Sequence, residues 1–596
     1  MLAIGQPDIV ICVLLASLIL FATDALRYDL IALGVAITLA LTGCLEPSEA
    51  FRGFSSEAVV LIASMYVFGH ALSRTGLSEL LGSRILARGV PGEAFLVLRI
   101  VLLSGLLSSV LSNTGVVAAL IPVCSGLARS RGIPASRLLM PLAFGSLLGG
   151  LVTLVGTSTN LLVNEEVTRA GVTPFGVFEF GPLGLTLLAL GGAYFLGPGR
   201  LLLPRSPVDQ SLSERYEVPK FVTEVLVSPS SLLLDRSVAD LEVFQRHHVT
   251  VLGIVRARGE SPVLAPGPTN RVRSDDTLIL QGTPDDLLRL SRELPLEQRP
   301  HVDTSTTRLY SDDVRLVEVV IPTGSSLIGR TLATSGLRSR TNLNVVAIAK
   351  HGQVQSGRLR DTPLEVGTTL LVQGHARDLD RVRDERELLV LGSYEVPFLG
   401  REAWTTALLL IAILVSGATT QASLAVLGAA GALALVLTRC IRADQVYRAI
   451  DWSVIALVGG MLALGEAFKR WGLSESLGEW IASLGEDGLG PRGQVFLLLT
   501  TTVLLTQVLA NVATAAIMAP IALHMAHEAG LSDRPFLMAV VTGSSLAFLS
   551  PVAHQSNAMV VGPGGYRYAD FLRAGLPMTV IMVAASTVLI PLIWPF

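Results

Sequence analysis

Charged residues are scarce in this chain of 596 residues, since Asp, Glu, Lys and Arg together make up only 16%, whereas hydrophobic residues make up 51%. The mean hydropathy of +0.58 is higher than a soluble core explains. The formal net charge of -3 shows no excess of positive charge, so nothing indicates nucleic acid as a partner. These values predict an integral protein of the lipid bilayer that also carries a sizeable soluble portion.

Cysteine is also scarce, and the signatures of common enzymes are missing. The four cysteines lie in or beside apolar stretches without CxxC spacing, and so predict neither a disulfide nor a structural zinc. The sequence has no Gly-x-Ser-x-Gly elbow, P-loop or His-Glu-x-x-His motif. We therefore expect no enzymatic activity, and no cofactor other than a coupling ion.

Arginines flank an apolar segment at about 95–130 on both sides. By the positive-inside rule both flanking loops are cytoplasmic, so the segment enters and leaves the membrane on the same face. It is therefore predicted to be a re-entrant hairpin, between spanning helices at about 9–22, 30–44 and 57–73 and further crossings at about 138–163 and 182–203. The flanking arginines are Arg74, Arg84, Arg88, Arg129, Arg131 and Arg137.

Three polar residues, Ser112, Asn113 and Thr114, lie in the middle of this apolar hairpin. Unpaired polar groups at membrane depth cost several kcal/mol, so these side chains need partners. One interpretation is that they hold packed helices together. The other is that they line a cavity, where a broken helix offers carbonyls to Na+ and amides to an anion. The second interpretation predicts an ion-coupled transporter, and a second copy of the pattern favours it.

The second copy lies about 397 positions further along the chain. Cys44 recurs as Cys440, and the stretch Ser112–Pro122 recurs as Ala510–Pro520. The interrupted stretch Val155–Asn160 likewise has its counterpart at Pro551–Asn557. We therefore predict two membrane repeats, 1–204 and 396–596, each with five helices and a re-entrant hairpin, the second hairpin at about 492–528. Because five crossings are an odd number, the second repeat is expected to be inverted.

Between these repeats, residues 205–395 are predicted to form a soluble α/β insert, since charges are frequent and no segment is long enough to span. The stretch Glu224–Ser231 resembles Glu318–Ser325, which divides the insert into units at 205–300 and 301–395. Both resemble TrkA C-terminal domains. This resemblance implies cytoplasmic regulatory modules that dimerise and can bind a small effector, although an inert dimerisation platform is equally compatible. The Gly-x-Gly-x-x-Gly fingerprint is missing, so NAD is not implied.

The whole chain is similar to the divalent anion/sodium symporter family in its paired Asn hairpins and in the stretches Gly156–Asn160 and Gln555–Tyr566. This resemblance implies a homodimer in the cell (inner) membrane, in which a transport domain moves like an elevator against a scaffold. It implies one Na+ site at Ser108, Ser112, Asn113 and the Gly156 carbonyl, and another at Thr506, Asn511 and the carbonyl near Ala553. The residues implied to contact the anion are Asn113, Thr114, Thr157, Asn160, Asn511, Thr514, His554 and Asn557.

The sequence departs from the family pattern at Ala510-Asn511-Val512, where many members repeat Ser-Asn-Thr. Two hydroxyl donors are missing, which favours a compact dianion such as sulfate over a dicarboxylate. His554 and Gln555 could replace those donors, so a sodium/dicarboxylate symporter remains an alternative. A proton-coupled or exporting anion transporter is another alternative, although neither hairpin core contains a carboxylate for a proton relay. A TrkA-type potassium system would need a Thr-Val-Gly-Tyr-Gly filter, which the sequence does not have.

Overall fold

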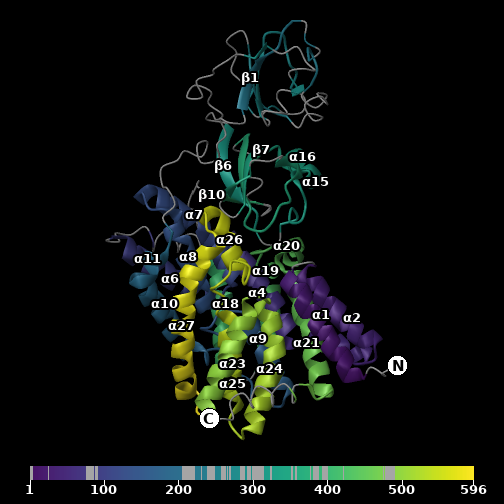
Figure 1. Ribbon diagram of the computed structural model, residues 1–596, viewed down its shortest axis with the longest axis vertical. Helices are drawn as coiled ribbons and strands as arrows, with labels where there is room; N and C mark the ends of the chain where they lie inside the picture. The colour runs from purple at the N-terminus through teal and green to yellow at the C-terminus, as the bar shows by residue number, and fades with distance from the viewer. Residues whose placement is uncertain are drawn as a thin grey trace.

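The computed structural model describes residues 5–23, 26–75, 86 and 92–204 of the first half and 401–420, 422–473, 476 and 490–596 of the second. It describes 222–298 and 314–391 with gaps. The helices form one body, and two small sheets stand in line beyond one end of it (Figure 1). Arg84 and Arg88, used above to orient the first hairpin, lie outside the described residues.

The first half consists of helices that are interrupted where the sequence becomes polar. Its hairpin is formed by two helices that meet at residues 109–112, and a second interruption follows at residues 150–157. The helices are α1 (Gln6–Thr23), α2 (Tyr28–Leu41), α3 (Pro47–Ala50), η1 (Arg52–Ser55), α4 (Glu57–Arg74), α6 (Gly92–Ser108), α7 (Asn113–Arg131), η2 (Ala135–Arg137), α8 (Leu139–Gly149), α9 (Ser158–Arg169), α10 (Gly181–Leu196) and α11 (Pro198–Leu202).

The second half has the same order of long and interrupted helices. Three of its helices, α18, α21 and α27, are long and apolar enough to cross a membrane, whereas many of the other described apolar helices of the chain are shorter. The helices are α18 (Arg401–Thr419), α19 (Leu424–Leu437), α20 (Ala443–Ala449), α21 (Trp452–Arg470), α23 (Pro491–Thr506), α24 (Asn511–Glu528), α25 (Asp533–Ser545), α26 (Gln555–Gly564) and α27 (Tyr568–Ile593).

Side-chain hydrogen bonds to the backbone explain why the first hairpin turns where it does. The Ser109 hydroxyl donates to the Leu106 carbonyl at 2.7 Å, and the Ser112 hydroxyl accepts from the Gly115 N–H at 3.2 Å. Such bonds offer the backbone an alternative to the helix. In the second hairpin Gln507 has this role, since its amide nitrogen donates to the Val503 and Leu546 carbonyls and its oxygen accepts from the Leu549 N–H.

The two halves interlock through equivalent contacts. Helix α2 packs on α21, and α4 packs on α19. Arg74 donates to the Gln445 side chain at 2.5 Å, and Arg470 forms an ion pair with Glu49. Arg74 and Arg470 lie 396 positions apart, and Glu49 and Gln445 are separated by the same number. The two contacts are therefore equivalent, and each joins one half of the chain to the other.

The two sheets share one strand order and one irregularity. The first is β3-β2-β4-β1-β5 and the second is β8-β7-β9-β6-β10, and all pairings are antiparallel. A register shift at 251–253 in the first sheet recurs at 345–347 in the second. The strands are β1 (Val222–Leu226), β2 (Thr250–Val255), β3 (Val263–Leu264), β4 (Thr277–Gln281), β5 (Glu297–Gln298), β6 (Val314–Val320), β7 (Asn344–Lys350), β8 (Gln353–Val354), β9 (Thr369–His375) and β10 (Leu389–Leu391).

Short helices accompany the second sheet, and each sheet has its own apolar core. The helices are α15 (Leu332–Ser335), α16 (Leu337–Thr341) and η5 (Leu359–Asp361). Buried Val and Leu side chains of β1, β2 and β4 form the first core. The second core combines residues of β6, β7 and β9 with Leu327 and Leu337. The part of the chain between the two helical halves therefore contains two separately packed units.

Candidate functional site

A cavity of about 250 Å³ lies between the turns of the two hairpins. Both halves of the chain contribute to its wall, together with apolar and aromatic side chains of α1, α2, α4 and α21. None of its described lining residues is an acid, a lysine or an arginine. The lining residues that the sequence predicted are Ser112, Asn113, Thr114, Gly156, Thr157, Asn511, Ala553 and His554.

Four helices begin at this cavity. Their first residues, Asn113 of α7, Ser158 of α9, Asn511 of α24 and Gln555 of α26, all line it. The first N–H groups of a helix have no partner within the helix, and the helix dipole places partial positive charge at the same end. Four such ends around one cavity favour a bound anion without any cationic side chain in its wall.

A hydroxyl and an amide oxygen meet beside the first hairpin turn. The Ser108 hydroxyl donates to the side-chain oxygen of Asn113 at 2.5 Å, and both residues are buried. A Cβ added at Gly150 would lie 3.0 Å from the same oxygen, so glycine leaves the space that the Asn113 side chain occupies. Two side-chain oxygens are thus held together next to the cavity.

The second hairpin repeats this pair with different chemistry around it. The Thr506 hydroxyl donates to the Asn511 side-chain oxygen at 3.1 Å and lies 2.9 Å from the Ser544 carbonyl oxygen. Ala510 and Val512 line the cavity where the first hairpin has Ser112 and Thr114. The cavity therefore has hydroxyl groups at one hairpin turn and methyl groups at the other.

Asn160, Thr514 and Asn557, which the sequence assigned to the anion, are not among the described lining residues of the cavity. The Asn160 amide donates to the carbonyls of Gly150 and Thr153, both at 2.9 Å. The Asn557 amide donates to those of Ala547 and Ser550, at 2.6 and 3.1 Å. These bonds cap carbonyls at the two helix breaks, so the structure gives both amides a place behind the cavity wall.

Several buried oxygens beside the breaks have no hydrogen-bond partner among the described residues. Four of the five occupy equivalent positions, since Thr159 and Ser556, and Asn160 and Asn557, lie 397 positions apart. Buried acceptors without a donor are costly, and they indicate either water or a cation. The atoms are Thr159 Oγ1, Asn160 Oδ1, Thr514 Oγ1, Ser556 Oγ and Asn557 Oδ1.

His554 caps α26 with its ring. Its Nδ1 accepts from the Ser556 N–H at 3.0 Å, which places the proton of the neutral imidazole on Nε2 as a donor. Thr157 holds the equivalent position in the first half but makes no side-chain bond to α9. The two ends of the cavity therefore differ here as well.

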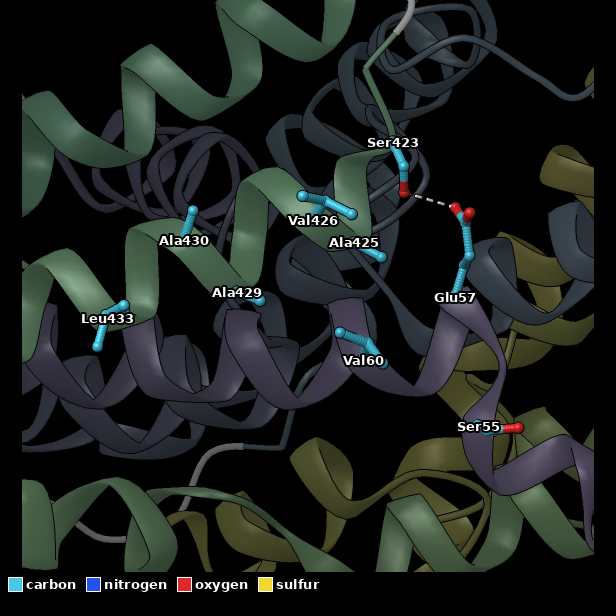
Figure 2. A pocket seen from close by; sticks show the side chains of 9 residues that line it. All are labelled: Ser55, Glu57, Val60, Ser423, Ala425, Val426, Ala429, Ala430 and Leu433. Atoms are coloured by element: carbon cyan, nitrogen blue, oxygen red, sulfur yellow. Dashed lines mark hydrogen bonds between the residues drawn. The ribbon is translucent and has the colours of Figure 1, made fainter.

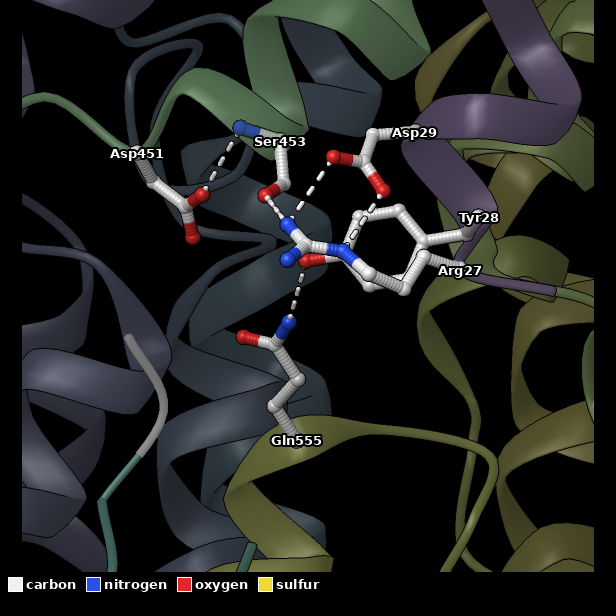
Figure 3. Close-up of polar contacts among 6 residues, drawn as sticks. All are labelled: Arg27, Tyr28, Asp29, Asp451, Ser453 and Gln555. Carbon is white, nitrogen blue, oxygen red and sulfur yellow. Dashed lines mark hydrogen bonds and ion pairs between the residues drawn. The ribbon is translucent and has the colours of Figure 1, made fainter. Parts of the chain in front are cut away.

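The sequence did not predict a polar bridge that joins α2 to α26 at the edge of the cavity (Figure 3). The Gln555 amide donates to the Tyr28 hydroxyl at 3.1 Å. Arg27 next to it pairs with Asp29 at 2.9 Å and donates to the Ser453 hydroxyl at 3.0 Å. The sequence signal was the Arg-Tyr-Asp triplet at 27–29, which lies between two apolar runs.

Asp451 closes this network. Asp451 is the residue before α21, and its carboxylate accepts from the Ser453 N–H at 3.0 Å. Burial raises its pKa, and the hydrogen bonds from the start of α21 oppose that effect.

A second hollow, of about 490 Å³, lies between α4 and α19 and fits an anion poorly (Figure 2). Its wall consists mostly of Ala, Val and Leu side chains. The Ser423 hydroxyl donates to Glu57 at 2.7 Å at one end. Because its one described charged group is a carboxylate, this hollow would repel an anion.

A family model described as citrate transporter, CitMHS, matches residues 18–530 and 487–596 of this chain. An uncharacterized transporter from Synechocystis, sll0640, is 33% identical over 608 residues, which cover 100% of this chain and 98% of that protein. Sodium/sulfate cotransporter 2 of Chlamydomonas reinhardtii is 26% identical over 62% of this chain and 43% of its own length. The crystal structure of the YdaH transporter from Alcanivorax borkumensis matches 93% of this chain and 87% of that one, at a TM-score of 0.45 and 12% identity.

Proposed function

Because this chain belongs to the CitMHS citrate transporter family, we propose that it is a sodium-coupled symporter of a small divalent anion, with sulfate as the favoured substrate. The family and the apolar helices make it a membrane protein that transports an anion. The observation that carries the proposal is the convergence of four helix N-termini on one cavity, among whose described lining residues none is an acid, a lysine or an arginine. Dipoles of this kind stabilise an anion where a fixed cation is missing.

Sodium is the second substrate in this proposal. Na+ is a hard cation that favours hydroxyl, amide and carbonyl oxygens, as the pairs Ser108–Asn113 and Thr506–Asn511 provide. The Gly156 and Ala553 backbones, which line the cavity, would complete these two sites. The unpartnered buried oxygens beside both breaks support a cation in this region. Bound Na+ would add positive charge next to the anion, which couples the two ligands.

The asymmetry of the cavity supports sulfate over a dicarboxylate. A long dicarboxylate needs donors at both ends, whereas Ala510 and Val512 offer none. A relative named as a sodium/sulfate cotransporter agrees with this choice. The alternative substrate is a dicarboxylate, whose second carboxylate His554 and Gln555 would bind. In a proton-coupled or exporting carrier of the same family, the Asn pairs would have no coupling role.

We also propose how the carrier is built and moves. The reciprocal contacts of Arg74 and Arg470 agree with two inverted repeats. The hairpins with α8, α9, α25 and α26 would form a transport domain that moves like an elevator against the other helices. The shared strand order of the two sheets agrees with a duplicated TrkA C-terminal module, cytoplasmic and regulatory, on a homodimer of the inner membrane.

The test is uptake of labelled sulfate and of labelled succinate into proteoliposomes at fixed pH, with and without an inward Na+ gradient. Sulfate uptake that requires Na+ and that excess succinate does not reduce is the expected result. Uptake of succinate would refute the choice of substrate but keep sodium symport. Uptake of either anion that follows an imposed proton gradient and ignores Na+ would overturn the proposed coupling.

A further inference from the structure

The second sheet is joined to the helical body by a contact between backbones. We name residues 314–391 the second unit and residues 365–369 the docking turn. Gly367, in this turn, has a φ of +79° and lies so close to α26 that a Cβ there would overlap the Ala558 carbonyl oxygen. From the other side, a Cβ at Gly562 would overlap the Gly367 carbonyl oxygen and the Thr369 hydroxyl. Neither surface has room for one more carbon.

The docking turn is itself held rigidly. The Gly367 N–H donates to the Ile321 carbonyl at 2.9 Å, and the Glu365 N–H donates to the Thr368 hydroxyl at 3.1 Å. Lys350 of β7 also pairs with Glu365 at 2.8 Å. The turn therefore moves with the sheet, and a displacement of the sheet would be passed directly to α26.

The face of α26 that receives this turn is next to the candidate site. Ala558 and Gly562 are one turn apart on the helix, and Gln555, at the cavity, precedes Ala558 by three residues, about 5 Å along the axis. Between them, Asn557 fixes the preceding break through the Ala547 and Ser550 carbonyls. The docked face and the N-terminus at the cavity thus belong to one short, rigid segment.

The second unit also rests on a helix of the other half. Strand β10 lies against α7, and β6 lies against α26 (Figure 1). Val320 and Leu391 are buried in the same apolar cluster as the membrane helices, with Val366 and Leu389 packed against it. Helices α7 and α26 also contact each other, and both begin at the cavity. One unit therefore bridges two helices that come from different halves of the chain and begin at the same cavity.

We propose that the second unit clamps α7 and α26 together through the docking turn, so that the two helix N-termini keep their relative position during transport. The clamp makes the soluble region the control element of the site, since any change in its docking alters both helices at once. This inference rests on the proposed transport function for its consequence, but the mechanical connection itself can be measured independently.

Two glycine substitutions test the clamp, and the chain offers a matched control for each. Gly367→Ala and Gly562→Ala each insert a carbon into the contact. Gly329→Ala introduces the same backbone strain in the same unit, since Gly329 has a φ of +77° but no atom within 4 Å of an added Cβ. Gly126→Ala adds a carbon to α7 in open space. The controls therefore separate undocking from strain and from helix substitution.

The first measurement is hydrogen exchange of the full chain in detergent. In the test variants, undocking should accelerate exchange in peptides that cover 555–564 and 113–117, while exchange in peptides of α2 should equal that of the parent. In both control variants, exchange in all of these peptides should equal that of the parent. The second measurement is anion uptake, for which both test variants should lower the maximal rate at least about fivefold. Sulfate binding, measured as the rise in melting temperature with added sulfate, should weaken, because both helix N-termini lie at the cavity.

Unchanged exchange at α7 and α26 in both test variants would overturn the clamp, whether or not the protein transports sulfate. Faster exchange with undiminished uptake would show that the contact does not control transport. Faster exchange with a sulfate-induced rise in melting temperature equal to that of the parent would show that the contact does not set the positions of the two helix N-termini, which also contradicts the inference. Failure of the parent protein to take up any anion with Na+ would refute the proposed function, while hydrogen exchange would still decide on the clamp.

Discussion

Asn160 and Asn557 lie 397 positions apart and make the same pair of hydrogen bonds, each through its side-chain amide to two carbonyls of the preceding helix break. Both residues are fully buried, so no water replaces a lost bond at low cost. Equivalent side-chain hydrogen bonds thus stabilise the two helix breaks that border the cavity.

Replacing either amide should destabilise the protein. Asn160→Ala and Asn557→Ala each remove the side-chain donor of two buried carbonyls, of which, among the described residues, only that of Thr153 keeps a backbone donor, the Gly156 N–H. Each substitution should cost about 1–3 kcal/mol of the free energy of unfolding. Thermal melting in detergent measures this, with Thr186→Ala on the exposed side of α10 as the control. A melting temperature equal to that of the parent for both variants would contradict the structural role given to these amides.

The hydroxyl of Ser108 should matter for sodium and not for folding. Ser108→Ala removes one proposed Na+ ligand, and the Na+ concentration for half-maximal uptake should rise about tenfold, as one lost charge-assisted contact predicts. Ser104→Ala is the matched control, because Ser104 is also buried on α6 but bonds the Val101 carbonyl. Equal Na+ dependence of the two variants would remove Ser108 from the site.

The two asparagines of the hairpin turns should be indispensable for coupled uptake. Asn113→Ala and Asn511→Ala each remove an oxygen that meets a hydroxyl beside the cavity. Each variant should fold but lose Na+-driven uptake by about 100-fold or more, comparable to loss of a well-placed polar contact in a buried site. Size-exclusion chromatography checks folding. Normal uptake in both variants would refute the site.

Restoring the missing hydroxyls should change the substrate preference. The double variant Ala510→Ser with Val512→Thr gives the second hairpin turn the residues of the first. Succinate uptake relative to sulfate uptake should rise by about tenfold, since a buried donor that meets a carboxylate contributes on the order of 1 kcal/mol or more. Competition between the two labelled anions measures the ratio, and an unchanged ratio would contradict the argument from the missing hydroxyls.

Acid should weaken the link between Glu49 and Arg470. The pKa of Glu49 is lowered mainly by the hydrogen bond that its carboxylate accepts from the Glu46 N–H, and then by the charge of Arg470. A carboxyl whose pKa is lower in the folded than in the unfolded state contributes stability above the unfolded pKa, and this contribution is lost as the pH falls. The melting temperature of the parent should therefore fall more in acid than that of Glu49→Gln. The equivalent contact of Arg74 with neutral Gln445 should show no such dependence.

The two hairpin turns could be located from the sequence because polar residues interrupt an apolar run there. The same interruption recurs at a constant offset in the second half of the chain. The structure places Asn113 and Asn511 on one cavity, and the family model confirms the family resemblance. Local pattern does not tell where a side chain points. The sequence assigned Asn160 and Asn557 to the anion, and the structure shows in addition that their amides donate to carbonyls of the helix breaks.

Contacts between distant segments had no sequence signal. The Tyr28 hydroxyl meets Gln555 at a separation of 527 positions, and although the triplet at 27–29 is polar between apolar runs, nothing in it indicates Gln555 as the partner. The docking of Gly367 on Ala558 depends on how two separately packed parts meet, which periodicity does not describe. Positions of this kind become visible only when the fold brings them together.

If each hydroxyl–amide pair binds one Na+, as proposed above, the duplication of the pair sets the charge carried in each transport cycle. Two Na+ ions, one at each pair, would balance one divalent anion, so the loaded carrier would move no net charge. It would then be insensitive to the membrane potential, which acts with about 2.3 kcal/mol per charge at 100 mV. A tenfold gradient of Na+ contributes about 1.4 kcal/mol per ion. Two ions would then sustain a concentration ratio of about 100 for the anion, a limit set by the number of paired oxygens and not by the affinity of the site.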